Sequence, residues 1–160
     1  MEISTRDLTL VTMFAALYAA LVYVFAPISF MALQFRVAGV IRPIIAKKWT
    51  LAIGYGLGAV VGNLFSPFAG PWDLLFMPMM SVVAGVLGYV VSKKFGQNYF
   101  ICGVVIATVI SFSVAFMLMQ FGTPFIVSFP YLLIAEQIVC LIGSVIFKLV
   151  EGRYKWWETN

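Results

Sequence analysis

Few residues of this chain could do chemistry, because only 10 % of its 160 residues are charged and histidine is absent. Four charged side chains stand inside long apolar stretches, away from the basic clusters: Arg36, Arg42, Asp73 and Glu136. Without histidine there is no imidazole metal ligand or imidazole base, and the isolated acids form no nucleophile–base pair. The pattern therefore favours a binding site over an active site. We expect no enzyme activity, no metal and no cofactor.

The elements that position these charges belong to a membrane protein. The hydrophobic fraction is 63 %, and the charged fraction lies well below the roughly 25 % of soluble domains. Long uncharged stretches approach or exceed the roughly 18 residues of a membrane span. They are Leu8 to Phe35, Leu51 to Trp72, Leu74 to Ser92 and Phe95 to Ala135. The fold class is predicted to be all-α, as one integral membrane domain over residues 1–160.

Turn residues and lysine pairs divide the chain into six predicted transmembrane helices. They are Leu8–Ala26, Phe30–Ala46, Trp49–Phe65, Leu74–Ser92, Tyr99–Gln120 and Tyr131–Phe147. With this division, the lysines and arginines between and beyond the helices fall on one side, and the loops 27–29, 66–73 and 121–130 contain none. Because basic residues mark the cytoplasmic side, we predict a multi-pass plasma-membrane protein with both termini cytoplasmic.

The loops on the opposite side share proline and phenylalanine, in FAPISF, LFSPFAGPWD and QFGTPFIVSFP. We expect them to form an apolar lid over a small-molecule site with a few polar groups beneath it. Neutral amides lie near these helix ends, at Gln34, Asn63 and Gln120, where each could instead satisfy backbone groups. Acids, amides and an aromatic ring suit a planar, nitrogen-rich heterocycle. The candidate stacking rings are Phe30, Phe68 and Trp72.

Each isolated charge has alternative interpretations. Asp73 either caps the helix that follows it or contacts the ligand. Arg36 either extends to the outer interface or pairs with Glu136, whereas Arg42 is expected to reach the inner interface. Pro43 should kink or end the second helix. Glu136 is expected about 7–8 Å below the outer end of the last helix, and a ligand contact is the preferred interpretation.

Small residues recur at four-residue spacing in two predicted helices. The first helix contains Ala15, Ala16, Ala19 and Ala20, and the third contains Gly54, Gly58 and Gly62. Such stripes let membrane helices approach closely. The glycines are interpreted as packing within this chain. The alanines serve either that purpose or docking to another membrane subunit.

The stretches FAPISFMALQFR (25–36) and NLFSPFAGPWDLLF (63–76) closely resemble the queuosine-precursor transporter family (QueT type). The resemblance covers most of the chain and implies a substrate-binding S component of an energy-coupling factor (ECF) transporter, which takes up a 7-deazaguanine such as preQ0 or preQ1. It also implies docking through A-x-x-x-A onto a transmembrane coupling subunit that works with two ATPase subunits. By the same resemblance, the site is lined by Gln34, Arg36, Asn63, Trp72 and Asp73. The chain departs from the family at Ala38-Gly39, where a serine-glutamate pair is common.

We therefore predict a binding subunit in the lipid bilayer, with ATP hydrolysis on partner subunits because a G-x-x-x-x-G-K-[ST] loop is missing from the sequence. The basic residues are scattered in pairs at helix ends, so nucleic acid is not an expected partner. The alternatives are an S component for another vitamin-like heterocycle and a stand-alone secondary transporter. An intramembrane enzyme and a purely structural subunit are disfavoured.

Overall fold

The computed structural model describes residues 4–29, 35–67 and 69–154, and this part of the chain is helical without strands, as predicted. In chain order the elements are α1 (Thr5–Val24), α2 (Ala26–Ser29), the 3₁₀ helix η1 (Val37–Lys47), α3 (Leu51–Asn63), the π-helical turn η2 (Trp72–Phe76), α4 (Met77–Lys93), α5 (Tyr99–Met119) and α6 (Phe125–Glu151).

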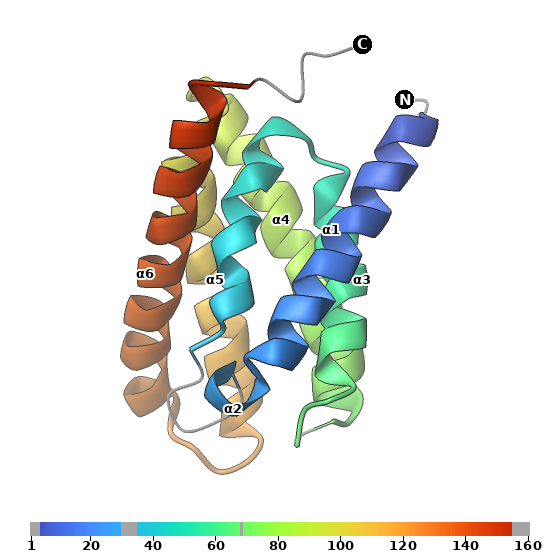
Figure 1. The fold of residues 1–160 in the computed structure, drawn as a ribbon. Coiled ribbons are helices and arrows are strands. Elements are labelled where there is room, and N and C mark those ends of the chain that lie inside the picture. The colour runs from blue at the N-terminus through green and yellow to red at the C-terminus, as the bar shows by residue number, and fades with distance from the viewer. Residues whose placement is uncertain (1–3, 30–34, 68, 155–160) are drawn as a thin grey trace.

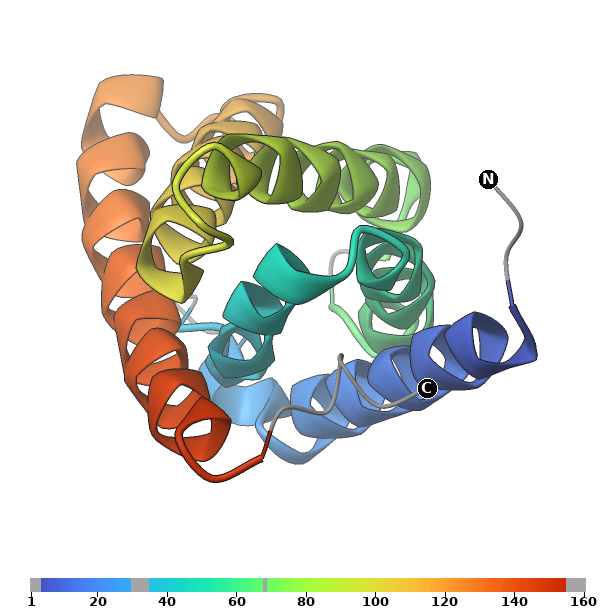
Figure 2. The same cartoon turned by 90° about the horizontal axis from the view of Figure 1, so that it is seen from above.

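The 3₁₀ helix η1 occupies the middle of the bundle. It contacts α1, α3, α4, α5 and α6, and the view in Figure 2 shows it enclosed by these longer helices. Pro43 lies inside η1 and lacks the N–H that an α-helix would use, in keeping with the predicted disturbance of this helix. Whatever polar side chains η1 carries are therefore placed in the interior of the protein.

The start of α1, the end of η1, the end of α4, the start of α5 and the end of α6 lie together at the top of Figure 1. We call this the basic end, because it holds the clustered lysines and arginines. In the described part of the chain they are Arg6, Lys47, Lys48, Lys93, Lys94, Lys148 and Arg153. The segregation of charge along the bundle axis agrees with the pattern found in the sequence.

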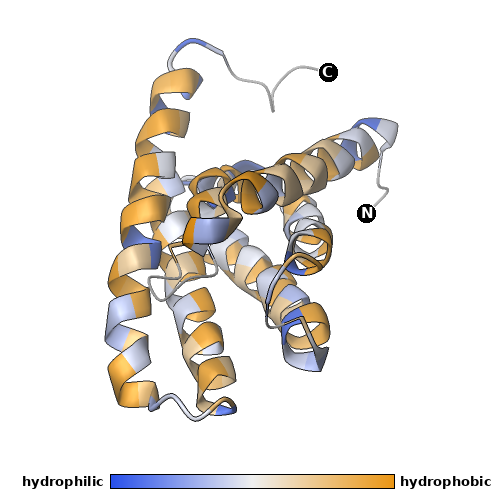
Figure 3. Cartoon of the chain, turned by 60° about the horizontal axis from the view of Figure 1, so that its bottom comes forward, coloured by the Kyte–Doolittle hydropathy of each residue, from blue (hydrophilic) through white to orange (hydrophobic). Residues whose placement is uncertain are grey.

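Four helical segments are long and apolar enough to cross a membrane among the described residues: Thr5–Val24, Trp72–Lys93, Tyr99–Met119 and Phe125–Glu151. Hydrophobic residues dominate the long helices in Figure 3. The 13 residues of α3 rise only about 20 Å, and the 11 residues of η1 about 22 Å, short of a hydrocarbon core of about 30 Å. The protein is thus a helical membrane protein, while six full crossings stay a prediction.

Several helix boundaries differ from the predicted ones. In the described part of the second predicted helix, Phe30–Ala46, the helical residues begin only at Val37. Helix α1 begins three residues early because Ser4 and Asp7 form a reciprocal capping box. Helix α6 begins at Phe125 instead of Tyr131, since it continues through Pro130. Pro130 is the sixth residue of α6 and cannot donate to the carbonyl oxygen four residues earlier, so the helix continues past it without that hydrogen bond. Glu136 therefore lies about 16 Å along α6, not the predicted 7–8 Å below the helix start.

The glycines of α3 pack against α1, as the sequence predicted. A Cβ atom added at Gly54 would lie 2.7 Å from the Val11 carbonyl oxygen, and one at Gly58 would lie 2.8 Å from that of Ala15. On α6, a Cβ at Gly143 would lie 1.9 Å from the Val40 carbonyl oxygen of η1. These close approaches need residues without side chains.

Two ion pairs join neighbouring helices at the basic end. Lys47 Nζ lies 2.7 Å from Glu151 Oε1, and Lys48 pairs with Asp7. The adjacent lysines therefore tie the end of the central helix η1 to the end of α6 and to the start of α1. Sequence reasoning missed both pairs, because each acidic partner is far from its lysine in the sequence: Glu151 near the end of the chain and Asp7 near its start.

Candidate functional site

The first polar cluster in the interior, the Glu136 cluster, is built around Arg42 of η1 and Glu136 of α6. Arg42 is fully buried and Glu136 is 4 % exposed. Arg42 Nη1 donates to Glu136 Oε2 in an ion pair, and Nη2 donates to the Tyr18 hydroxyl at 3.2 Å. The prediction that Arg42 reaches the inner interface was wrong, and so was the alternative that Glu136 pairs with Arg36, since its partner is Arg42. The preferred interpretation, a contact of Glu136 with the ligand, stays a prediction. A charge at this depth requires such a partner.

Aromatic rings complete the Glu136 cluster. The Arg42 guanidinium carbon lies 5.2 Å from the centroid of the Tyr55 ring and 5.8 Å from that of Tyr18. The two rings meet edge to face at 5.0 Å, and both tyrosines are fully buried. Cation–π contacts of this kind stabilise a desolvated guanidinium. Sequence reasoning did not select either tyrosine, although a phenol inside an apolar helix is a signal that a polar partner lies nearby.

Helical geometry explains how Arg42 is accommodated. A 3₁₀ helix has three residues per turn, so Arg36, Gly39 and Arg42 lie on one face of η1. A Cβ added at Gly39 would lie 3.0 Å from Arg42 Nη1 and 3.0 Å from a methyl of Val139. Gly39 therefore leaves the space that the Arg42 guanidinium occupies. It stands at one of the two positions, Ala38-Gly39, where a serine-glutamate pair was expected.

The second polar cluster, the Asn63 cluster, contains Arg36, Asn63 and Asp73, at the end of the bundle opposite the basic end. Arg36 Nη2 donates to Asn63 Oδ1 at 3.1 Å. Asn63 Nδ2 donates to the backbone oxygen of Asp73 at 2.8 Å and to its Oδ1 at 3.0 Å. Asn63 is fully buried and Asp73 is 3 % exposed. The structure thus brings together three residues that the sequence singled out on separate elements.

Asp73 does not cap a helix, which removes one of its two interpretations. It lies inside the π-helical turn η2, and neither η2 nor α4 has a side-chain cap at its start. Its second carboxylate oxygen, Oδ2, is buried without a hydrogen-bond partner among the described residues, as is Arg42 Nε. Buried polar atoms without partners are rare in proteins. In the two clusters, three buried polar atoms therefore lack a hydrogen-bond partner in the described structure: Asp73 Oδ2, Arg42 Nε and the Tyr55 hydroxyl.

Trp72 precedes Asp73 but takes a different direction. Its ring packs edge to face on Phe76 at 5.5 Å and on Phe116 at 6.1 Å. Beside these rings, residues of η2, α4 and α5 line an open apolar pocket of about 240 Å³, among them Phe76 and Phe116. Phe30 and Gln34, which were also predicted to contact the ligand, lie outside the described residues, as does the candidate stacking ring Phe68.

The four alanines of α1 divide between two faces. Ala19 is buried and Ala15 is partly buried, on the side that packs against the glycines of α3. Ala16 and Ala20 are exposed. An apolar groove of about 410 Å³ lies near this exposed face and is lined by residues of α1, η1 and α3, among them Met13 and Leu17. The packing interpretation therefore applies to Ala15 and Ala19, and docking through Ala16 and Ala20 stays a prediction.

The described chain is an all-helical membrane protein whose interior holds two buried polar clusters. Comparison with protein families places it further. Residues 8–152 match the family described as QueT transporter, so the chain belongs to the QueT transporter family. No curated protein and no solved structure matches the chain.

Proposed function

We propose that this protein is the membrane-embedded substrate-binding subunit of an ECF-type importer that captures a 7-deazaguanine such as preQ0 or preQ1 from outside the cell. The observation that carries the proposal is membership of the QueT transporter family over nearly the whole chain. The buried Asn63 and Glu136 clusters support it, because a transporter of a polar heterocycle needs donors and acceptors inside an apolar bundle.

The hydrogen-bond pattern assigns different roles to the two central residues of the Asn63 cluster. Both N–H groups of the Asn63 amide are used by Asp73, and its oxygen accepts from Arg36. Asn63 therefore holds the other two residues in place and is a positioning residue. Asp73 keeps Oδ2 without a partner in the described structure. We assign Asp73 as the direct acceptor for ring or exocyclic N–H groups of the ligand, since a carboxylate is an acceptor only.

The Glu136 cluster lies deeper, and it is proposed to define the inner wall of the site. Arg36 and Arg42 are two turns of 3₁₀ helix apart, about 12 Å along η1. Arg42 Nε offers a donor that suits a carbonyl or ring nitrogen. Glu136 is held by Arg42 and neutralises the charge of its guanidinium. A heterocycle with N–H donors along one edge and acceptors along another matches this arrangement, as guanine-like rings do.

The orientation follows from the distribution of charge. The basic end is assigned to the cytoplasm, which places both termini there. The Asn63 cluster then lies toward the outside, where the ligand enters. Residues 30–34, 68 and their loops are proposed to cover it, with Phe30 and Gln34 at the ligand and Trp72 at its edge.

Energy for uptake is proposed to come from partner subunits, a coupling subunit in the membrane and two ATPases. The exposed pair Ala16 and Ala20, beside the apolar groove of α1, is the proposed docking surface. Small exposed residues let a second helix approach closely. Ala15 and Ala19 are less available, because they face α3.

Binding of preQ1 to the purified protein, measured by isothermal titration calorimetry, tests the proposal. Asp73→Asn removes the carboxylate charge at similar volume, and we expect Kd to rise about 10- to 100-fold, the usual range for a hydrogen bond to a charged group. Gln137→Ala is the matched control, because the Gln137 amide bonds Thr108 and the Val104 carbonyl oxygen, away from both clusters. Failure of the wild-type protein to bind any 7-deazaguanine would overturn the assigned substrate, and equal affinity in Asp73→Asn would overturn the assigned contact.

Uptake experiments separate the ECF mechanism from a stand-alone secondary transporter. We expect cells that make this chain alone to accumulate no labelled preQ1, and cells that also make the coupling and ATPase subunits to accumulate it. Uptake by the chain alone would favour the secondary transporter.

A further inference from the structure

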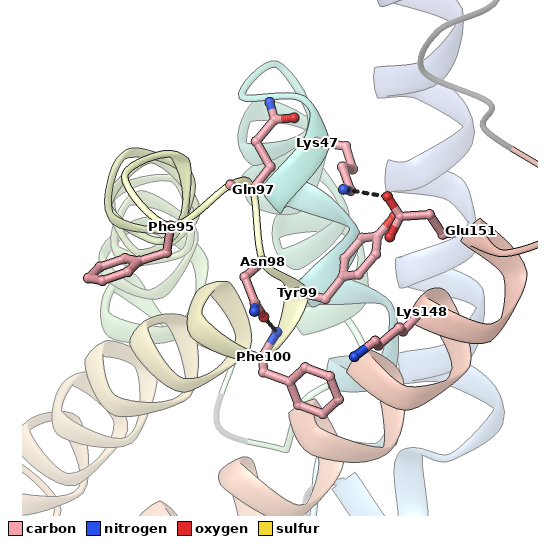
Figure 4. A pocket seen from close by; sticks show the side chains of 9 residues that line it. Lys47, Phe95, Gln97, Asn98, Tyr99, Phe100, Lys148 and Glu151 are labelled. Carbon is pink, nitrogen blue, oxygen red and sulfur yellow. Dashed lines mark hydrogen bonds and ion pairs between the residues drawn. The ribbon is translucent and has the colours of Figure 1, made fainter.

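A further pocket lies at the basic end, and residues of the two polar clusters do not line it. The α4–α5 connection, the start of α5, the last turns of α6 and the end of η1 surround a cavity of about 180 Å³ (Figure 4). Its walls include Asn98, Tyr99 and Phe100 of the α5 start, with Lys47, Lys148 and Glu151 opposite them. None of these residues takes part in the proposed transport site. We call this the Lys148 pocket.

The Lys148 pocket carries a net positive charge that comes from one lysine. Lys47 Nζ is paired with Glu151 at 2.7 Å and lies 4.7 Å from the centroid of the Tyr99 ring. Lys148 Nζ lies 5.7 Å from the centroid of the Phe100 ring, and no carboxylate in the described chain pairs with it. Figure 4 shows its ammonium directed into the space in front of Phe100. The pocket therefore has a lysine whose charge is not neutralised by a carboxylate of the described residues.

The surroundings of the pocket suit the headgroup level of a bilayer. Lys148 stands in the last turn of α6, a helix of membrane-spanning length. Lys93 and Lys94, at the end of α4, directly precede the pocket residue Phe95. Phe95, on the pocket wall, is 61 % exposed. Lysines and exposed aromatic rings at helix ends are typical of the membrane–water interface. Basic pockets between helices at the cytoplasmic side are sites where anionic headgroups bind.

We propose that the Lys148 pocket binds the phosphate of an anionic phospholipid headgroup, with Lys148 as its main cation. The cavity holds a phosphate ester with its glycerol, and the acyl chains extend past Phe95 and Phe100 along the outside of α5 and α6. Glu151 keeps Lys47 in place on the opposite wall and makes the pocket selective for headgroups of low negative charge. The proposal is independent of the transported ligand.

Native mass spectrometry of the detergent-purified protein, titrated with phosphatidylglycerol or with phosphatidylcholine, tests this assignment. We expect tighter binding of phosphatidylglycerol, and about a fivefold loss of that affinity in Lys148→Gln, the value of one lysine near an anionic headgroup. Lys148→Arg should keep most of the affinity. Lys93→Gln is the control, because Lys93 lies at the same end outside the pocket, with its ammonium over the Tyr89 ring.

Three results would overturn the proposal. Equal loss in Lys148→Gln and Lys93→Gln would show attraction to the basic end as a whole, without a pocket. Equal binding of phosphatidylcholine would show that the headgroup charge is not recognised. Saturable displacement of phosphatidylglycerol by millimolar inorganic phosphate would assign the pocket to a soluble phosphate. Circular dichroism of each variant, with wild-type helix content required, keeps misfolded protein out of the comparison.

Discussion

Breaking the buried ion pair of the Glu136 cluster should destabilise the protein strongly. In Glu136→Gln, Arg42 keeps its hydrogen bond to Tyr18 but loses the carboxylate that pairs with it in the described structure. Its guanidinium stays fully buried beside two tyrosine rings. Removing one partner of such a pair costs about 3–5 kcal/mol, because the remaining charge is left uncompensated. For a chain of this length that cost corresponds to a fall in Tm on the order of 10 °C.

The native cysteines provide the assay. Cys102 and Cys140 are both buried, so a thiol-reactive fluorophore labels them only as the protein unfolds. We expect Glu136→Gln to melt far below the wild type, and Gln137→Leu, on the next residue of α6, to melt close to it. The double variant Arg42→Met, Glu136→Met should recover much of the loss, since it buries no charge. A double-mutant cycle then isolates the coupling between the two side chains.

Two outcomes would refute this reasoning. An unchanged Tm in Glu136→Gln would contradict the pairing of Arg42 with Glu136. Strictly additive effects of the two single substitutions would show that Arg42 and Glu136 do not interact.

Other predictions concern helix contacts. Ala16→Trp should abolish co-purification with the coupling subunit and leave preQ1 affinity unchanged, and normal co-purification would refute the docking surface. Gly143→Ala should lower the free energy of unfolding by at least about 1–3 kcal/mol, the cost of overpacking, because a Cβ there meets a backbone carbonyl of η1. Thermal unfolding measures this loss. Gly152→Ala is the control, because a Cβ has room at that position. Lys48→Asp should lower Tm by a few degrees through repulsion from Asp7, and the exchanged double variant Lys48→Asp, Asp7→Lys should restore it.

The sequence allowed good prediction of features that depend on local composition. Long apolar runs define α1, α4, α5 and α6, because every backbone group in a bilayer must be satisfied within its own helix. The glycine stripe of α3 correctly predicted a close helix contact. The motif around Asn63 and Asp73 led to the right family and to two residues that lie in hydrogen-bond contact.

Other features could not be predicted locally. Helix α6 was predicted to begin after Pro130, and the resulting error in depth separated Glu136 from its true partner. The 3₁₀ form of η1 also could not be predicted, because the same apolar residues are compatible with an α-helix. The two helix types differ in which residues lie on one face. In η1 this difference places Arg36 and Arg42 on one face.

The sequence by itself determined that this chain is a helical membrane protein with a basic end, a transporter family and a short set of buried charges. Only the tertiary structure decided which charges meet. Arg42 and Glu136 are 94 positions apart, and Arg36 bonds Asn63 across 27 positions. Such pairings depend on the depth and rotation of whole helices, which are set by the packing of many side chains at once. Burial requires that each charged side chain have a partner, and the packing of the helices determines which side chain that partner is.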